Sequence, residues 1–371
     1  MSQVEGERVP LSALIEAENL PRLLVMSFGV WLYAADSTLV ATLMPVAVED
    51  IGGLPYLSWT YTLYQLGSVV TGAIVGLVVL RTGIVRAEIV AGVLYVLGCA
   101  LSAYAPDMSI MILGRLLQGM GGGGLVSLAF IGASTLFPKK LWVRVIAVIS
   151  AIWGVSSLCG PLIGGYFVNI GNWRGAFWAF ALQGLVTIFV APPLLRKHFQ
   201  SQTEEIQPLP LARLGILSIA VLAICQAGVV TSTQFAGGLC ASGIVLLLIF
   251  LKQDMDSENR IFPRGILNPR TVSGSGLLMI SSLFMATISL TVYGPMLMYI
   301  IFGAAPLVAG YIIALESLAW TLTAVFTSGL RERIEPRLIR MGAVFVSVSM
   351  LGLIYAMPEG PLWLIALFSV I

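Results

Sequence analysis

Residues 57–80 read LSWTYTLYQLGSVVTGAIVGLVVL, a stretch without a single charged side chain. Because an α-helix rises 1.5 Å per residue, about 20 such residues cross the roughly 30 Å hydrocarbon layer of a membrane. Similar apolar blocks recur on both sides of this stretch, at 23–45, 89–104, 109–137, 145–168, 176–195, 214–231, 235–251, 272–302, 307–330, 341–357 and 362–371. The sequence therefore predicts an all-α, polytopic bundle of transmembrane helices.

Composition supports a membrane protein and excludes several functions. Of the 371 residues, 58% are apolar and 10% are charged, against about 25% charged in a soluble domain. A net charge of +2, spread over short loops, excludes a nucleic-acid partner. The four cysteines lie in apolar blocks without metal-ligand spacing, so we expect no metal and no cofactor. No catalytic set can be assembled around the single histidine, His198, and an enzyme is not expected.

Positive charge predicts the orientation in the membrane. All but two of the 20 Lys and Arg residues, the exceptions being Arg115 and Arg174, fall on the side of the N-terminus, as cytoplasmic loops require. Residues 1–22 lack the apolar core of a signal peptide. We therefore predict a multi-pass protein of the cell (inner or plasma) membrane with a cytoplasmic N-terminus.

Polar stretches divide the chain into segments. The last apolar block has about half the length of a crossing, from which the second half is expected to be incomplete. The predicted segments are a cytoplasmic N-terminal segment (1–22), an N-terminal six-helix half (23–195), a cytoplasmic linker (196–213), two inserted transmembrane helices (214–251), a cytoplasmic loop (252–271) and a partial C-terminal half (272–371).

Three charged residues lie deep inside predicted spans: Asp36, Arg115 and Glu316. A charge at the centre of the bilayer costs about 2.5–3.5 kcal/mol and usually faces a bundle interior or an aqueous cavity. In the functional interpretation, Asp36 and Glu316 take up and release protons in exchange for substrate. In the alternative, Arg115 neutralises one carboxylate only to hold helices together. The sequence does not decide which carboxylate Arg115 pairs with.

Glycines form a second pattern. In Gly160-Pro161-Leu-Ile-Gly164-Gly165, proline removes a backbone hydrogen bond and the glycines allow close helix contact, so we expect a bend and tight packing. A GxGxxG run, formed by Gly119, Gly121 and Gly124, lies within a span and does not follow a strand. It therefore indicates a packing surface and not a dinucleotide site.

These motifs resemble the major facilitator superfamily, and within it the drug:proton antiporters of the fourteen-helix branch. Arg115-Leu-Leu-Gln118-Gly119-Met-Gly121 is similar to the fourth-helix signature of that family, and the glycine-proline segment beginning at Gly160 is similar to its fifth-helix antiporter motif. Asp36-Ser-Thr-Leu-Val-Ala-Thr-Leu-Met-Pro45 resembles its first-helix pattern. The resemblance implies two pseudo-symmetric halves, a part for Arg115 and Gln118 in proton coupling, and cation binding by Glu316.

The loop between the second and third spans departs from the family pattern. The family shows GxLADRxGRR, whereas this chain has Leu80 at the aspartate position and retains Arg81 and Gly83. In the family that aspartate is implicated in holding the two halves together in one conformation. The resemblance therefore implies a gating loop at Arg81 and Gly83 whose usual carboxylate is missing.

The expected function is proton-coupled antiport of small amphipathic or cationic compounds by alternating access, as in multidrug efflux. The expected partners are a small-molecule substrate, protons and the lipid bilayer, the protein acts as a monomer, and a proton gradient supplies the energy. Two alternatives stay open: a metabolite or siderophore transporter of the same fold, and a truncated membrane protein that transports nothing. An ion channel is disfavoured because the sequence has no filter signature or charged ring.

Overall fold

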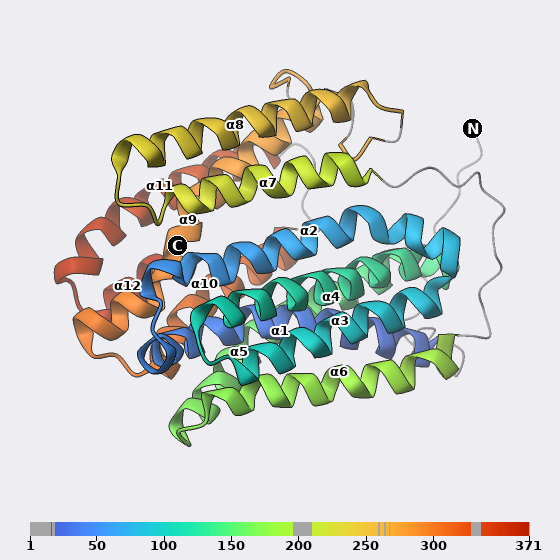
Figure 1. Cartoon of the computed structure of the whole chain (residues 1–371), viewed down its shortest axis with the longest axis horizontal. Helices are drawn as coiled ribbons and strands as arrows, with labels where there is room; N and C mark the ends of the chain where they lie inside the picture. Colours follow the sequence, from blue (N-terminus) through green and yellow to red (C-terminus); the bar gives the residue numbers. More distant parts are fainter. Residues whose placement is uncertain are drawn as a thin grey trace.

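The computed structural model describes residues 16, 19–195, 210–258, 260–262, 265–266, 268–327 and 335–370. This part of the chain is helical and contains no strand, which confirms the all-α fold (Figure 1). The predicted segments 1–22 and 196–213 lie mostly outside the described residues. The helices are α1 (Leu20–Ile51), α2 (Leu57–Thr82), α3 (Ile84–Tyr104), α4 (Met108–Thr135), α5 (Trp142–Asn169), α6 (Trp173–Leu195), α7 (Leu211–Ala227), α8 (Thr233–Asp256), α9 (Val272–Phe302), α10 (Pro306–Thr327), α11 (Glu335–Glu359) and α12 (Leu362–Val370).

Within the described residues, nine helices are long and apolar enough to cross a membrane: α1 to α6, α8, α9 and α11. Helices α7 and α10 contribute shorter apolar stretches. Several helices extend beyond the predicted apolar blocks. Helix α1, for example, continues past residue 45 to Ile51. Its last turn carries Glu49 and Asp50, which are exposed, as expected for a turn outside the hydrocarbon layer.

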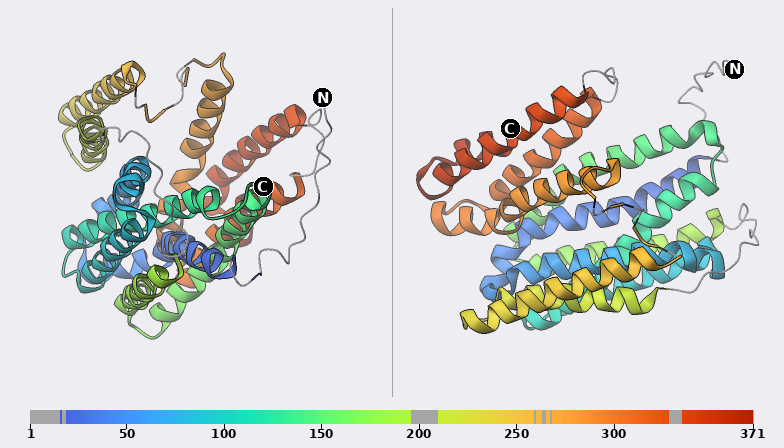
Figure 2. Two further views of the ribbon diagram at one scale, coloured as in Figure 1. Left: turned by 90° about the vertical axis from the view of Figure 1, so that its right-hand side faces the viewer. Right: turned by 90° about the horizontal axis from the view of Figure 1, so that it is seen from above.

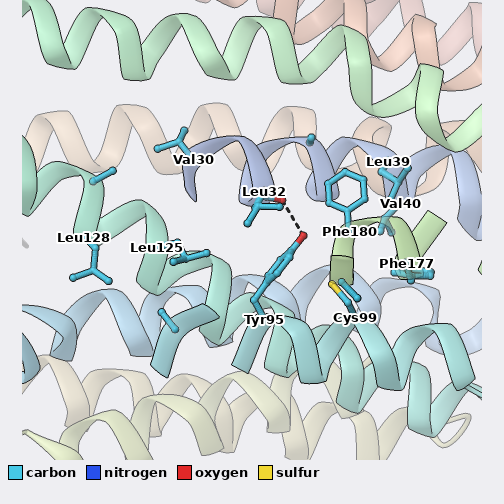
Figure 3. Packing of buried hydrophobic residues seen from close by; sticks show 14 of the residues in the cluster. Val30, Leu32, Leu39, Val40, Tyr95, Cys99, Leu125, Leu128, Phe177 and Phe180 are labelled. Atoms are coloured by element: carbon cyan, nitrogen blue, oxygen red, sulfur yellow. Dashed lines mark hydrogen bonds between the residues drawn. The ribbon is translucent and has the colours of Figure 1, made fainter. Parts of the chain in front are cut away.

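Helices α1 to α6 form one bundle around α1, which packs against α4, α5 and α6. The core of this bundle includes Val30, Leu32, Leu39, Phe177 and Phe180, none of which is exposed to solvent. Figure 3 shows these side chains between α1, α4 and α6, and the Tyr95 hydroxyl of α3 donates to the Leu32 carbonyl at 3.1 Å. Helix α1 is therefore a central and largely buried element, as expected for a helix that carries a buried charge.

Helices α9 to α12 form a second bundle with a smaller core, which includes Leu290, Met298, Ile313, Ala356 and Ile365. Seen along the helices, this bundle and the first lie side by side (Figure 2). Helix α10 joins them, because it packs against α5 and α1.

The contact between the two bundles is closest near the end of α5 and the beginning of α10. A Cβ atom added to Gly310 would lie 3.1 Å from Cβ of Pro161, and one added to Gly165 would lie 2.9 Å from Cβ of Leu307. Helices α5 and α10 run in opposite directions, so this contact involves the end of the membrane opposite to residues 139–144. By the predicted orientation, this is the outer end.

Helices α7 and α8 form a hairpin that lies apart from the second bundle and touches the first through α2 (Figure 2). A buried ion pair closes it, with Arg213 Nη1 2.5 Å from Asp254 Oδ1. The Asp254 carboxylate also accepts the backbone N–H groups of Ile261 and Phe262, both at 2.9 Å. Asp254 thus fixes both the helix pair and the chain that follows it.

Breaking this pair is expected to cost substantial stability. In Arg213→Leu, the buried Asp254 carboxylate loses the one counter-charge that it has among the described residues, a change that typically costs about 3–5 kcal/mol. Arg174→Leu is the matched control, because Arg174 pairs with the half-exposed Asp50 and solvent-exposed pairs contribute little. Thermal unfolding of both purified variants in the same detergent is the measurement. A melting temperature for Arg213→Leu equal to that of the control would contradict the structural importance of the hairpin pair.

Candidate functional site

The candidate site is centred on an ion pair buried between α1 and α4. Arg115 Nη1 lies 2.9 Å from Asp36 Oδ2, and the two side chains are 1% and 0% exposed. Asp36 lies near the middle of α1, and Arg115 lies about two turns inside α4. The structure thus answers the question that the sequence left open: Arg115 pairs with Asp36, and not with Glu316.

Gln118 completes the polar group, one turn after Arg115 on the same face of α4. Its amide nitrogen lies 3.3 Å from each oxygen of the Asp36 carboxylate. Its carbonyl oxygen accepts hydrogen bonds from Arg115 Nη1 at 3.3 Å and from the Ser102 hydroxyl at 2.8 Å. Gln118 therefore bridges acid and base, and α3 holds it in place through Ser102.

Helix α2 covers the guanidinium group of Arg115. The centroid of the Tyr64 ring lies 4.0 Å from the guanidinium carbon of Arg115, within the range of a cation–π interaction. Arg115 Nε donates to the Thr60 carbonyl at 3.4 Å. Four helices thus contribute to one buried polar cluster, formed by Asp36, Tyr64, Ser102, Arg115 and Gln118.

This arrangement has two chemically distinct states. With Asp36 ionised, the opposite charges compensate each other in a site without solvent contact. If Asp36 takes up a proton, the Arg115 charge is left with neutral partners, and the low dielectric makes that state costly unless helices move or another anion approaches. Protonation of Asp36 would therefore weaken the contact between α1 and α4 that the ion pair provides.

Glu316 lies apart from this cluster, on α10. It is half-buried, and Thr291 of α9 donates to its carboxylate at 3.3 Å. Among the described residues, no cation lies within ion-pair distance of it. The two carboxylates singled out in the sequence are therefore in different environments. Asp36 is neutralised in the first bundle, and Glu316 has no counter-charge among the described residues around it.

The glycine-proline segment lies where α5 contacts both α1 and α10. A Cβ atom on Gly160 would lie 2.8 Å from the Ala35 carbonyl oxygen, and one on Gly164 would lie 3.1 Å from the Leu39 carbonyl oxygen. Gly165 faces Leu307 of α10. The expected tight packing is confirmed, and α5 continues through Pro161 as one helix.

The predicted gating residues lie at the junction of α2 and α3. Arg81 is exposed in the last turn of α2. Gly83 is the single residue between the two helices, with φ of +83°. A side chain at this φ is strained, so glycine permits the abrupt junction. Along α2, Arg81 follows Tyr64 by 17 residues, about 25 Å of helix, so both residues lie far from the Asp36–Arg115 pair.

Two kinds of residue escaped the sequence analysis. Tyr64 and Ser102 read as ordinary span residues, and only their proximity to Arg115 and Gln118 reveals their part. Glu88 is 5% exposed in the second turn of α3, although the predicted span began at residue 89. Asp36 and Glu316 were predicted as the carboxylates deep within spans, and Glu88 adds a carboxylate that helix packing encloses near the end of a span.

The fold and the buried charges define a class, that of multi-pass membrane transporters rather than enzymes. The chain belongs to the Major Facilitator Superfamily, whose family model matches residues 26–371. It is 29% identical over 356 residues to a probable multidrug-efflux transporter of Mycobacterium tuberculosis. The match covers 93% of this chain and 74% of the relative. It is 27% identical over 339 residues to a multidrug transporter protein of Bacillus subtilis, in a match that covers 86% of this chain and 61% of the relative.

Solved structures agree on the fold. A D-xylose–proton symporter matches with a TM-score of 0.60 and 16% identity, covering 95% of this chain and 78% of the symporter. A POT family transporter in complex with 5-aminolevulinic acid matches with a TM-score of 0.64 and 13% identity, covering 94% of this chain and 79% of the transporter. At such identities the similarity shows a common architecture.

Proposed function

We propose that this transporter is a proton-coupled antiporter that exports small amphipathic or cationic compounds. The observation that carries the proposal is the Asp36–Arg115 pair, a carboxylate and a guanidinium group without solvent contact inside a membrane bundle. Buried ionisable residues in membrane helices typically belong to substrate or proton pathways. The names of the mycobacterial and Bacillus relatives support multidrug efflux as the type of transport.

In the proposed cycle, the two bundles rock against each other around a site near the middle of the membrane. In the structure they meet at the predicted outer end, where α5 packs on α10. A proton that reaches Asp36 weakens its bond to Arg115 and favours a different packing of α1 on α4. Glu316 engages a cationic substrate. One elementary charge that moves down a membrane potential of 100 mV supplies about 2.3 kcal/mol, enough to maintain a roughly fifty-fold concentration gradient of the substrate.

The proposal includes a location and an oligomeric state. The protein acts as a monomer in the cell membrane with its N-terminus in the cytoplasm. The distribution of Lys and Arg supports this orientation, and the proton gradient takes the place of a cofactor.

Transport in inside-out vesicles tests this function. With an acidic lumen, we expect vesicles that contain the protein to accumulate ethidium and to lose lumenal protons in step with it. Both signals should vanish when the gradient is collapsed with an uncoupler. Ethidium accumulation that is indifferent to the gradient would rule out proton-coupled antiport.

Glu316→Gln gives a second prediction. The amide keeps the size of the side chain and its bond to Thr291 but removes the negative charge. Uptake of ethidium is expected to fall by about tenfold or more. This corresponds to the loss of about 1.4 kcal/mol or more of attraction between the carboxylate and the cationic dye. Uptake of an uncharged amphipathic dye through the same vesicles should change little. An equal loss for both dyes would show that Glu316 does not recognise the charge of the substrate.

A further inference from the structure

Glu88 is a buried carboxylate that the Asp36–Arg115 site does not use. It lies in the second turn of α3, and 5% of its surface is exposed. Among the described residues, no group forms a hydrogen bond or an ion pair with its carboxylate. An ionised carboxylate without such partners is costly to bury, and a group in this situation typically holds a proton instead. The surroundings of Glu88 therefore decide its chemistry.

The face of α3 that carries Glu88 is directed at the middle of the first bundle. Tyr95 and Cys99 follow it by seven and eleven residues, a spacing that keeps all three on one side of a helix. The Tyr95 hydroxyl donates to the Leu32 carbonyl of α1 at 3.1 Å (Figure 3), and Cys99 Sγ lies 3.2 Å from Nε2 of Gln118. Eleven residues correspond to about 16 Å of helix, so Glu88 is separate from the buried polar cluster, although it shares a face of α3 with it.

Helices α4 and α6 flank this face on its two sides. A Cβ atom on Gly124 of α4 would lie 3.0 Å from Cβ of Ala91, and a Cβ atom on Gly92 would lie 2.7 Å from the side chain of Ile188 of α6. Glu88 precedes Ala91 and Gly92 by one turn, toward the predicted cytoplasmic end. Its side chain therefore lies between the next turns of α4 and α6.

These facing turns offer the carboxylate no charge. Residues 125–136 of α4 and 188–195 of α6, all of them described, contain no titratable side chain. Helix α2 carries Arg81 in its last turn, and α3 itself carries Arg86, but both side chains are exposed. Glu88 is thus enclosed by apolar groups on the sides of α4 and α6.

Helix α1 contributes one buried cation at this end, Arg22, which is 6% exposed. Its Nη1 donates to the Leu136 carbonyl at 2.8 Å, while its Nε has no hydrogen-bond partner in the part of the chain that the structure describes. Helices α1 and α3 run in the same direction and are joined by the Tyr95–Leu32 bond. Counted back from this bond, Glu88 lies seven residues away and Arg22 ten, so Arg22 is about one turn nearer the predicted cytoplasmic end.

Two prolines remove hydrogen bonds from α6 at the depth of Glu88. Pro192 and Pro193 lie inside α6 and have no N–H group, so the Ile188 and Phe189 carbonyls lose their usual helical donors. Ile188 is on the side of α6 that contacts α3, and its carbonyl points along the helix toward the level of Glu88. A neutral carboxyl group is a donor as well as an acceptor. Protonated Glu88 can therefore supply the hydrogen that Pro192 lacks.

We propose that Glu88 is a proton-binding site, separate from Asp36, at the predicted cytoplasmic end of the first bundle. While α3, α4 and α6 are packed as in this structure, Glu88 holds its proton and donates it to the carbonyl that Pro192 leaves free. When the end of α6 moves and water enters, the O–H bond of the carboxyl group breaks and the proton passes to water. Arg22 then stabilises the carboxylate. This inference rests on the proposed antiport and adds a site where a proton leaves the protein.

Infrared spectroscopy of the purified protein in lipid nanodiscs reports this proton directly, because neutral and ionised carboxyl groups absorb at different frequencies. Subtracting the spectrum of Glu88→Gln from that of the unaltered protein isolates one group. We expect this difference to contain a neutral-carboxyl band at pH 7. Glu258→Gln is the matched control, since Glu258 is exposed and an exposed glutamate is ionised at this pH. A difference spectrum that shows Glu88 as an ionised carboxylate would overturn the inference.

The prolines of α6 provide a second test, which does not require Glu88→Gln to fold. Pro192→Ala returns a donor to the Ile188 carbonyl, so the Glu88 carboxyl group loses its acceptor and its band should shift to the frequency of a more weakly bonded acid. Pro193→Ala is the control, because it acts on the carbonyl of Phe189, whose side chain is 74% exposed on α6. Unchanged bands in both variants would overturn the bond between Glu88 and α6.

Exchange in inside-out vesicles tests the release of the proton, since the external medium then faces the cytoplasmic side. Raising the external pH favours release, so gradient-driven ethidium uptake by the unaltered protein should increase with it. Glu88→Gln releases one proton fewer and should lose up to about tenfold of this increase per pH unit. An equal pH dependence in the two proteins would overturn the part of Glu88 in proton release.

The site and the antiport can fail separately. A neutral-carboxyl band that depends on Glu88, in a protein whose ethidium uptake ignores the proton gradient, would refute antiport and leave the proton site standing. Gradient-driven uptake by a protein in which Glu88 is ionised at pH 7 would refute the site and leave antiport standing.

Discussion

Replacing Asp36 by asparagine is expected to reduce proton-driven exchange to the rate of protein-free liposomes. The amide occupies the space of the carboxylate but neither takes up nor releases a proton. It also leaves the Arg115 guanidinium group, 1% exposed, without the only carboxylate within ion-pair distance among the described residues. The measurement is ethidium uptake driven by an imposed pH gradient, normalised to the amount of inserted protein.

Asp50→Asn provides the matched control for this prediction. Asp50 is in the same helix, but it is 48% exposed at the end of α1 and pairs with Arg174. We expect the control to keep pH-driven exchange. If Asp36→Asn exchanged as fast as the control, Asp36 would not be a proton site.

A double variant separates proton coupling from simple stabilisation. Asp36→Asn alone leaves a buried charge unpaired, which costs about 3–5 kcal/mol, whereas removing both charges with Asp36→Asn and Arg115→Gln avoids most of that cost. We therefore expect the double variant to melt at a higher temperature than Asp36→Asn and to remain inactive. If the pair only holds α1 against α4, the double variant should recover exchange together with stability.

The helices could be predicted from the sequence because an apolar block of fixed length is a direct consequence of bilayer thickness. Depth along a helix follows from residue count, so Asp36 and Arg115 could both be placed inside the membrane. Their pairing could not be predicted, since it joins residues 79 positions apart. It depends on how α1 and α4 are rotated about their axes, and apolar residues on every side of these helices hide that rotation.

The same limit explains why the contact of Trp153 with Tyr33 could not be predicted. A tryptophan such as Trp153 inside a span looks like any lipid-facing residue, because lipid and a packed helix interface both accept aromatic surface. Only the structure shows that its ring meets Tyr33 of α1 edge to face. Glycines were easier to interpret, since a run such as Gly119 to Gly124 has one main physical use in a membrane helix, which is close approach to a neighbour.

Replacing Gly121 by valine is expected to prevent correct folding of the first bundle. A Cβ atom at this position would lie 2.6 Å from the Ala91 carbonyl oxygen and 2.6 Å from the Tyr95 Cα atom. Both are backbone atoms of α3, so no side-chain rotation relieves the clash and the helices must separate. Extra methylene groups in a well-packed core typically cost about 1–3 kcal/mol, and we expect this clash with rigid backbone atoms to exceed that range. The measurement is the yield of monodisperse protein after detergent extraction.

Gly76→Val is the control that isolates packing from the helix propensity of valine. Gly76 also lies within a membrane helix, α2, but a Cβ atom there would have no heavy atom within 4 Å. We expect this variant to be extracted and to unfold like the original protein. Separation of α3 from α4 also withdraws Ser102 from Gln118, so any folded fraction of Gly121→Val should show impaired exchange. Normal yield and normal exchange in Gly121→Val would mean that α3 and α4 are not as close as the structure shows, and that Gln118 bridges Asp36 and Arg115 without support from α3.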